Sequence, residues 1–265
     1  MLQALLHGKL SREQENMEDI LTSNVFGLLS YLPPAKGLLP FLAKAETLEG
    51  EKPLARLAAP GITEHVQMAE EDVRFWPWLE DETCDPCEPD LLLTIRSPGI
   101  PVMVLIEAKY RSGKSSEADE ADVEVTDQLG RQWDHLWPRA KKEKAQPLLL
   151  FVTAHAAMPR AAIRKSIGEY DDKRGPAIRR PMIAWLSWCW LPSLFEKQAL
   201  RSLKDLAALA RRLGFEMFEG FPRFWPIGKM PWQFDVGDVV MDGPVAPTTR
   251  FTWPNSGACN PWRFA

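Results

Sequence analysis

The sequence predicts an α/β fold, in which helices flank a mixed central β-sheet. Segments rich in apolar residues alternate along the chain with segments whose apolar residues recur at helical spacing. Two of the apolar segments, residues 89–95 and 101–110, are separated only by a Ser-Pro-Gly turn at residues 97–99. Such a short turn predicts an antiparallel hairpin. The expected order is helix, strand, hairpin, helix, strand, helix, strand, helix.

The first helix is expected to begin at Ser11, whose hydroxyl can cap a helix N-terminus, and to end at Pro33 and Pro34. Its apolar residues recur at helical spacing. They are Met17, Ile20, Leu21, Val25, Leu28 and Leu29. After a stretch rich in Pro and Gly, a first strand is expected within residues 65–78.

The second half of the chain predicts three helices and two strands. They are a helix at 123–137, a strand at 147–155, a helix at 159–170, a strand at 181–191 and a helix at roughly 193–213. Pro138 is expected to stop the first of these helices, and Gly214 to close the last one. The strand at 147–155 is apolar throughout, which is typical of a strand buried on both faces.

Charge is unevenly distributed along the chain. The 265 residues carry a formal net charge of −4, but residues 51–130 carry 7 Lys and Arg against 18 Asp and Glu, whereas residues 131–180 carry 12 against 5. A carboxylate-rich metal site beside a phosphate-binding surface gives this pattern, and solvated protein faces give it as well. The charge distribution therefore supports a nucleic-acid enzyme only weakly.

The sequence lacks the features of a secreted or membrane-spanning protein. The N-terminus has no basic start followed by an apolar run, and the longest apolar runs are too short to cross a hydrocarbon core of about 30 Å. Four cysteines fit a reducing compartment, so we expect a cytoplasmic protein. Cys84 and Cys87 could form half of a zinc site, but the sequence has no second close pair, which favours plain thiols.

Three polar residues stand at neighbouring strand ends of the predicted hairpin. Asp90 begins the first strand, and Glu107 and Lys109 end the second. Because side chains alternate along a strand, Glu107 and Lys109 share one face, and the hairpin places Asp90 opposite them. Carboxylates hold Mg²⁺ or Mn²⁺, and a lysine can orient water or neutralise developing charge. The trio therefore predicts hydrolysis of a phosphodiester.

Pro89-Asp90 followed by Glu107-x-Lys109 resembles the signature of the PD-(D/E)XK (restriction-endonuclease-like) nucleases. The resemblance covers about half of the chain and implies an αβββαβ core. It also implies a Mg²⁺- or Mn²⁺-dependent deoxyribonuclease, with Asp90 and Glu107 as metal ligands and Lys109 orienting the attacking water. The same resemblance is the only basis for expecting a microbial role in defence, repair or mobile-element processing.

The resemblance implies two further site residues. Several branches carry a glutamine on the helix after the E-x-K strand, and Gln128 occupies that place. Some branches carry a glutamate on the first helix as an additional metal ligand. Glu18 is the candidate here, with Glu13 and Glu15 as competitors. An exposed amide is the alternative reading for Gln128, and a solvated helix face is the alternative for Glu18.

Candidate nucleic-acid contacts come from basic residues around this site. They are Arg111, Lys114, Arg131, Lys141 and Lys142. Lys and Arg at these positions would bind phosphates without reading the base sequence, although each one alone is also an ordinary surface charge. The expected partner is a nucleic acid, with DNA preferred, and no membrane.

Two other functions compete with the nuclease. The run from Ala108 to Ser115 matches a relaxed phosphate-loop pattern, in which Gly113-Lys114-Ser115 would bind an NTP. The following residues are strongly acidic, and later strands end without an aspartate for Mg²⁺, which weighs against an NTPase. A catalytically silent domain that only binds nucleic acid or protein is the third reading.

We expect two parts in the chain. Residues 1–215 would form the nuclease-like domain, with its core at about 11–190, and residues 216–265 an extended tail. The last 45 residues hold seven prolines and four of the eleven tryptophans, without helical or strand periodicity. So much aromatic surface favours packing of the tail on the body, on a second copy in a homodimer, or on a partner protein.

Overall fold

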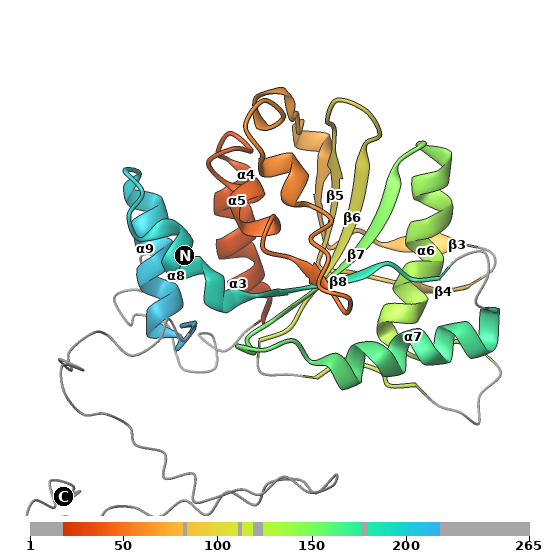
Figure 1. The fold of residues 1–265 in the computed structure, drawn as a ribbon. Helices are drawn as coiled ribbons and strands as arrows, with labels where there is room; N and C mark the ends of the chain where they lie inside the picture. The colour runs from red at the N-terminus through yellow and green to blue at the C-terminus, as the bar shows by residue number, and fades with distance from the viewer. Residues whose placement is uncertain (1–17, 82–83, 111–112, 119–123, 176–179, 218–265) are drawn as a thin grey trace, which may run out of the picture. The chain divides into compact units, whose positions relative to one another are not determined.

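The computed structural model describes residues 18–81, 84–110, 113–118, 124–175 and 180–217. Its centre is a six-stranded mixed sheet with the order β1-β8-β7-β6-β5-β2 (Figure 1). The strands are β1 (Glu46–Thr47), β2 (Val73–Phe75), β5 (Leu91–Ile95), β6 (Val102–Ala108), β7 (Gln146–Thr153) and β8 (Ile183–Ser187). A separate hairpin consists of β3 (Leu79–Asp81) and β4 (Cys84–Cys87).

Helices lie on both faces of the sheet. One face is covered by α3 (Glu18–Thr22), a π-helical turn η1 (Ser23–Gly27), α4 (Leu28–Ser30), α5 (Leu38–Leu42), α8 (Leu191–Phe195) and α9 (Arg201–Arg212). The other is covered by α6 (Gln128–Lys142) and α7 (Arg160–Arg174), as Figure 1 shows. The short 3-10 helices are η2 (Ala55–Ala58), η3 (Thr63–His65), η4 (Glu70–Asp72) and η5 (Trp188–Trp190). The predicted mixed sheet with flanking helices is confirmed.

The hairpin of β5 and β6 has the predicted antiparallel pairing. Leu91 pairs with Ile106 and Ile95 pairs with Val102, whereas β6 and β7 are parallel, as are β7 and β8. Both hairpin strands are buried along their whole length. Alternation divides their side chains between two apolar clusters, one on each face of the sheet. The hairpin is thus packed on both faces by apolar side chains.

Helix α6 does not stop at Pro138, contrary to the prediction. It continues to Lys142 with Pro138 inside it. Leu136 and Ala140 lie one turn apart on either side of this proline, and both are fully buried. Their packing against the sheet outweighs the backbone hydrogen bond that the proline cannot donate.

Two boundaries near the end of the described chain also differ from the prediction. Strand β8 ends at Ser187, because the Ser187 side chain accepts the backbone N–H of Cys189 and starts the η5 turn. The final helix, predicted as one element, is divided into α8 and α9. The residues between them, 196–200, are exposed, so no packing holds them in one continuous helix.

Some expectations fall partly outside the described residues. The predicted cap at Ser11 lies before residue 18, but the helical segment ends at Ser30, just before the two prolines, as predicted. The chain divides into units 1–219 and 220–265, and the structure describes residues of the first unit only, so the tail remains a prediction.

Within the described residues, no helix has the length and apolar character needed to cross a bilayer.

Candidate active site at the end of strand β6

The hairpin register brings Asp90 beside Glu107. Leu91 of β5 pairs with Ile106 of β6. Because the strands are antiparallel, Asp90, which precedes Leu91, lies opposite Glu107, which follows Ile106. The backbone N–H of Ala108 donates to Asp90 Oδ2 at 2.7 Å, which fixes this carboxylate against the end of β6. Both carboxylates are buried, with 8% of Asp90 and 3% of Glu107 exposed. The predicted proximity of the two acids is therefore present in the structure.

Lys109 lies between two glutamates. Its Nζ atom is 2.7 Å from Glu107 Oε1 and 3.0 Å from Glu18 Oε1. The second oxygen of Glu18 accepts the backbone N–H of Tyr110 at 2.8 Å. Helix α3 therefore contributes its first residue to the site, and Glu18, the weakest of the metal-ligand candidates by sequence, lies within it.

The backbone of Lys109 is held from two sides. Its N–H donates to the Val152 carbonyl of β7 at 2.7 Å, and its carbonyl accepts the indole N–H of Trp188 at 3.1 Å. Trp188 is fully buried and packs against the rings of Phe26 and Phe41. An aromatic core thus positions the lysine, which is the kind of rigid support that a reactive group needs.

Helix α6 supplies two amides to Glu107. Gln128 Nε2 donates to Glu107 Oε1 at 2.6 Å, and Gln132 Nε2 donates to Oε2. The Gln128 side-chain oxygen accepts the backbone N–H of Ser115 at 2.8 Å, which fixes the direction of its amide. Gln132 was not among the predicted site residues. Its spacing of four from Gln128, on the same helical face, is the signal that could have included it.

The crowding of carboxylates affects the ionisation of the site. Burial and the neighbouring Glu107 raise the pKa of Asp90 to about 7. Burial also raises the pKa of Glu107, against the opposing effect of Lys109. For Lys109, burial lowers the pKa, but Glu107 and Glu18 outweigh it and raise it to about 12. Lys109 therefore stays protonated at neutral pH, and its single positive charge faces more than one carboxylate.

The donor set fits a hard divalent cation. Among the described residues, no three or more His, Cys, Asp or Glu side chains are arranged as a preformed metal cage. Mg²⁺ commonly uses only one or two protein carboxylates and keeps several waters or substrate oxygens, so Asp90 and Glu107 match its needs in number and type. The carboxylate excess over Lys109 would be relieved by a bound cation.

Lys114, predicted as a phosphate contact, is instead part of the scaffold. Its side chain is 2% exposed and forms an ion pair with Asp127, which is fully buried and caps α6. Its Nζ also lies 3.1 Å from Ser166 Oγ of α7. A lysine held in this way cannot reach a phosphate. The same contacts weigh against the phosphate-loop alternative, as does the start of α6 at Gln128, well after Ser115.

The other predicted nucleic-acid contacts are scattered. Arg111 lies outside the described residues. Arg131 is partly buried and donates to Ser116 Oγ at 3.1 Å. Lys141 and Lys142 are exposed at the C-terminal end of α6, about 20 Å along the helix axis from Gln128. These lysines do not lie at the candidate site, because almost the whole length of α6 separates them from Gln128.

The two cysteines of the C-x-x-C pair lie at the ends of β4. Cys84 Sγ is 3.4 Å from Nε2 of His135, and that ring nitrogen also lies 2.8 Å from the Asp85 carbonyl. Burial raises the pKa of Cys87 to about 12, which keeps it a neutral thiol. The pair therefore behaves as packing residues against α6.

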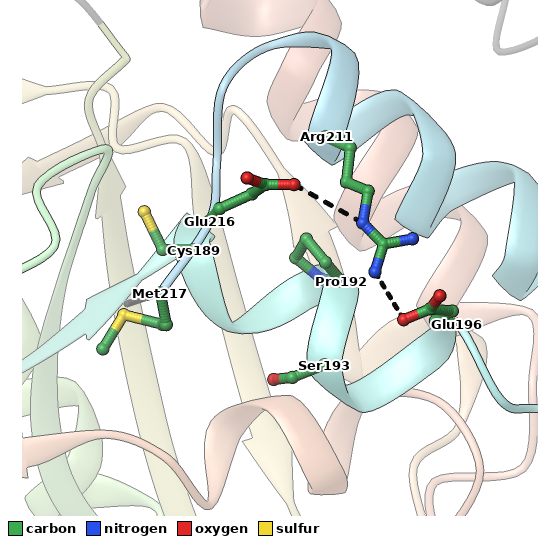
Figure 2. Close-up of a pocket in the computed structure, with 7 residues that line it drawn as sticks. All are labelled: Cys189, Pro192, Ser193, Glu196, Arg211, Glu216 and Met217. Atoms are coloured by element: carbon green, nitrogen blue, oxygen red, sulfur yellow. Dashed lines mark hydrogen bonds and ion pairs between the residues drawn. The ribbon is translucent and has the colours of Figure 1, made fainter. Parts of the chain in front are cut away.

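A hollow of about 230 Å³ lies beside α8 and the end of α9 (Figure 2). Arg211 extends between two carboxylates there, at 2.5 Å from Glu196 and 3.5 Å from Glu216. Both acids are largely exposed, and the guanidinium charge is already neutralised. The hollow shares no lining residue with the Asp90 site.

Comparison of the chain with protein-family models, with curated proteins and with solved structures found no match.

Proposed function

We propose that this protein is a metal-dependent nuclease that hydrolyses phosphodiester bonds at the end of β6. The observation that carries the proposal is the convergence of Asp90, Glu107 and Lys109. Asp90 directly precedes β5, Glu107 lies near the end of β6 and Lys109 directly follows it, with its ammonium 2.7 Å from Glu107. Keeping one lysine and several carboxylates together inside a protein is costly, which favours a functional reason for the arrangement.

Each residue has a distinct part in the proposed reaction. Asp90 and Glu107 would hold a divalent ion, which supplies Lewis-acid activation of the phosphoryl group and of water. Lys109 would orient the attacking water and stabilise the negative charge that develops on the phosphoryl oxygens. Gln128 and Gln132 hold the Glu107 carboxylate in one orientation. Glu18 holds Lys109 from the other side.

DNA is the preferred substrate class, as the sequence resemblance implies, with a setting in microbial defence, repair or mobile-element processing. This choice rests on the Pro89-Asp90 and Glu107-x-Lys109 motif, whose parts occupy the β5–β6 hairpin in the expected order. The cytoplasm is the proposed location, and a second copy or partner protein at the tail remains part of the proposal.

The test is a cleavage assay on labelled DNA and RNA with Mg²⁺, Mn²⁺ or EDTA. We expect wild-type protein to cut DNA only with the metal, and Lys109→Gln to lose at least about a hundredfold in rate, by analogy with the loss of one charge-stabilising group. The matched control is Lys197→Gln, which removes an exposed lysine between α8 and α9 and should leave the rate close to wild type.

Three outcomes would contradict the proposal of a metal-dependent nuclease at this site. Cleavage that survives EDTA and Lys109→Gln would exclude this site. Tight nucleic-acid binding without cleavage under any metal would favour the silent binding module. ATP hydrolysis that is lost in Lys114→Gln but kept in Lys109→Gln would favour the phosphate-loop NTPase.

A further inference from the structure

A second cavity, of about 210 Å³, is linked to the candidate active site through the backbone on two sides. One wall is formed by the start of the α3–η1 segment and the other by Trp76, the residue that follows β2. The lining residues are Asp19, Ile20, Ser23, Asn24 and Trp76. None of them belongs to the predicted site.

One wall is joined to the candidate active site by its chain neighbour and the other by a hydrogen bond. Asp19 follows Glu18, whose carboxylate is 3.0 Å from Lys109 Nζ. On the opposite wall, the Trp76 backbone N–H donates to the carbonyl of Asp90 at 3.0 Å. The cavity walls are therefore continuous with the segments that carry Glu18 and Asp90.

The backbone of Trp76 is strained, which favours a functional role for this residue. Its φ angle is +44°, in the left-handed region that residues with a Cβ atom avoid. The residue is 38% exposed, although the ring of Phe75 lies beside its indole, with centroids 5.5 Å apart. A strained backbone that presents a large aromatic ring to a cavity is typical of a ligand contact.

The chemistry of the lining selects the kind of ligand. An indole face can stack on a flat ring, and a hydroxyl, an amide and a carboxylate can hydrogen bond to its polar edge. The Asn24 amide is held in place, because its Nδ2 donates to the Ile20 carbonyl at 2.8 Å, and its oxygen is left to accept a hydrogen bond. The described lining residues include Asp19 but no Lys or Arg, so the cavity suits a neutral base and not a phosphate.

We propose that this cavity receives an unpaired nucleobase adjacent to the scissile phosphate, stacked on Trp76. The inference rests on the proposed nuclease function and specifies its substrate. A base can enter the cavity only after it has left a duplex stack. The preferred substrate is therefore a single strand, or a strand with an unpaired nucleotide at the cut site.

The experiment combines a variant of the protein with a variant of the substrate. Single-stranded oligonucleotides carry one abasic position, moved stepwise across the cut site, and are cut by wild type, Trp76→Ala and Trp76→Phe. We expect one abasic position to lower wild-type kcat/KM by roughly fivefold to a hundredfold, the range for one stacked base. Trp76→Ala should show the same loss on the intact strand and no further loss at that position, and Trp76→Phe should retain most of the rate.

The control is Trp78→Ala, which removes an exposed tryptophan whose indole N–H donates to Glu80 and which does not line the cavity. Its abasic profile should match wild type. Equal abasic sensitivity in wild type and Trp76→Ala, or a Trp76→Ala protein as active as wild type, would overturn the inference while leaving the nuclease intact. If wild type does not cut at all, the nuclease proposal fails, and the same comparison by fluorescence anisotropy of binding decides on the cavity.

Discussion

Two buried clusters of carboxylates and lysines lie close together in the chain, and they are built differently. The site cluster, at the end of β6, has three carboxylates, Glu18, Asp90 and Glu107, around the single ammonium of Lys109. The capping cluster, at the N-terminus of α6, joins Lys114 to Asp127 and Lys173 to Glu169. These lysines and carboxylates are equal in number in the capping cluster, whereas the site cluster has three carboxylates and one lysine.

Ionisation follows this difference. Burial raises the pKa of Glu169, but hydrogen bonds from Lys173, from the Thr126 hydroxyl and from two backbone N–H groups outweigh it and lower the pKa to about 2. Asp90 accepts one backbone N–H and faces Glu107, and its pKa rises to about 7. A balanced cluster stabilises the fold. The carboxylate excess of the other cluster is what a cation-binding site needs.

The largest effect that we expect is on stability, in the capping cluster. Lys114→Met leaves the fully buried Asp127 without its cation, which should lower the free energy of unfolding by about 3–5 kcal/mol. Urea denaturation followed by circular dichroism measures this change. A loss of less than about 1 kcal/mol, the value of an ordinary surface pair, would show that Lys114 is a solvated lysine after all.

In the site cluster the corresponding effect is on catalysis. Glu107→Gln keeps the size of the side chain but removes a proposed metal ligand, and the cleavage rate should fall by about a hundredfold to a thousandfold. Glu143→Gln, an exposed glutamate after α6, is the control and should cut at the wild-type rate. Full activity in Glu107→Gln would assign this carboxylate to the scaffold.

The two clusters should have opposite pH dependences. The pKa of Asp90 is raised from 3.8 to about 7, so its contribution to stability is present below about pH 4 and is lost as pH rises to 7. The pKa of Glu169 is lowered from 4.5 to about 2, so its contribution is present above pH 4.5 and is lost as pH falls to 2.

Urea midpoints measured without metal from pH 2 to pH 8 test this difference. Asp90→Asn should become more stable relative to wild type between pH 4 and pH 7, with a constant difference above that range. Glu169→Gln should become less stable relative to wild type as pH rises from 2 to 4.5. Parallel curves for wild type and both variants would remove the distinction between the clusters.

The smallest effect concerns Gln128, the glutamine that connects the two clusters. Gln128 contacts Glu107 on one side and Ser115, next to Lys114, on the other. Gln128→Ala should lower activity by roughly tenfold to a hundredfold through misplacement of Glu107, as supporting residues of metal ligands do. The loss should appear in kcat and in the metal concentration needed for half-maximal rate. A change in the free energy of unfolding alone would make Gln128 a structural residue.

Much of this geometry could be predicted from the sequence, because it follows from strand alternation and a short turn. The placement of Asp90, Glu107 and Lys109 needed only the hairpin at 97–99 and the period of a strand. Gln128 needed only its position on the next helix. These are local relations, in which a few residues determine the outcome.

The rest depended on contacts between distant segments. The residues that neighbour Lys114 in the sequence are those of an exposed loop. Its burial depends on the packing of α7, which contributes Ser166. The persistence of α6 through Pro138 depends likewise on packing against the sheet. Trp76 carries no local signal for a cavity, because the opposite wall comes from α3, far away in sequence.

The most direct test of the distinction compares Asp90→Asn with Asp127→Asn, two changes that remove one carboxylate charge and keep the shape. Asparagine can still accept the Ala108 N–H in the first and cap α6 in the second. We predict that Asp90→Asn abolishes metal-dependent cleavage at pH 7 with undiminished stability, whereas Asp127→Asn loses stability but cuts at the wild-type rate per folded molecule. Normal cleavage by Asp90→Asn, or loss of cleavage per folded molecule in Asp127→Asn alone, would contradict the assignment of the active site to the end of β6.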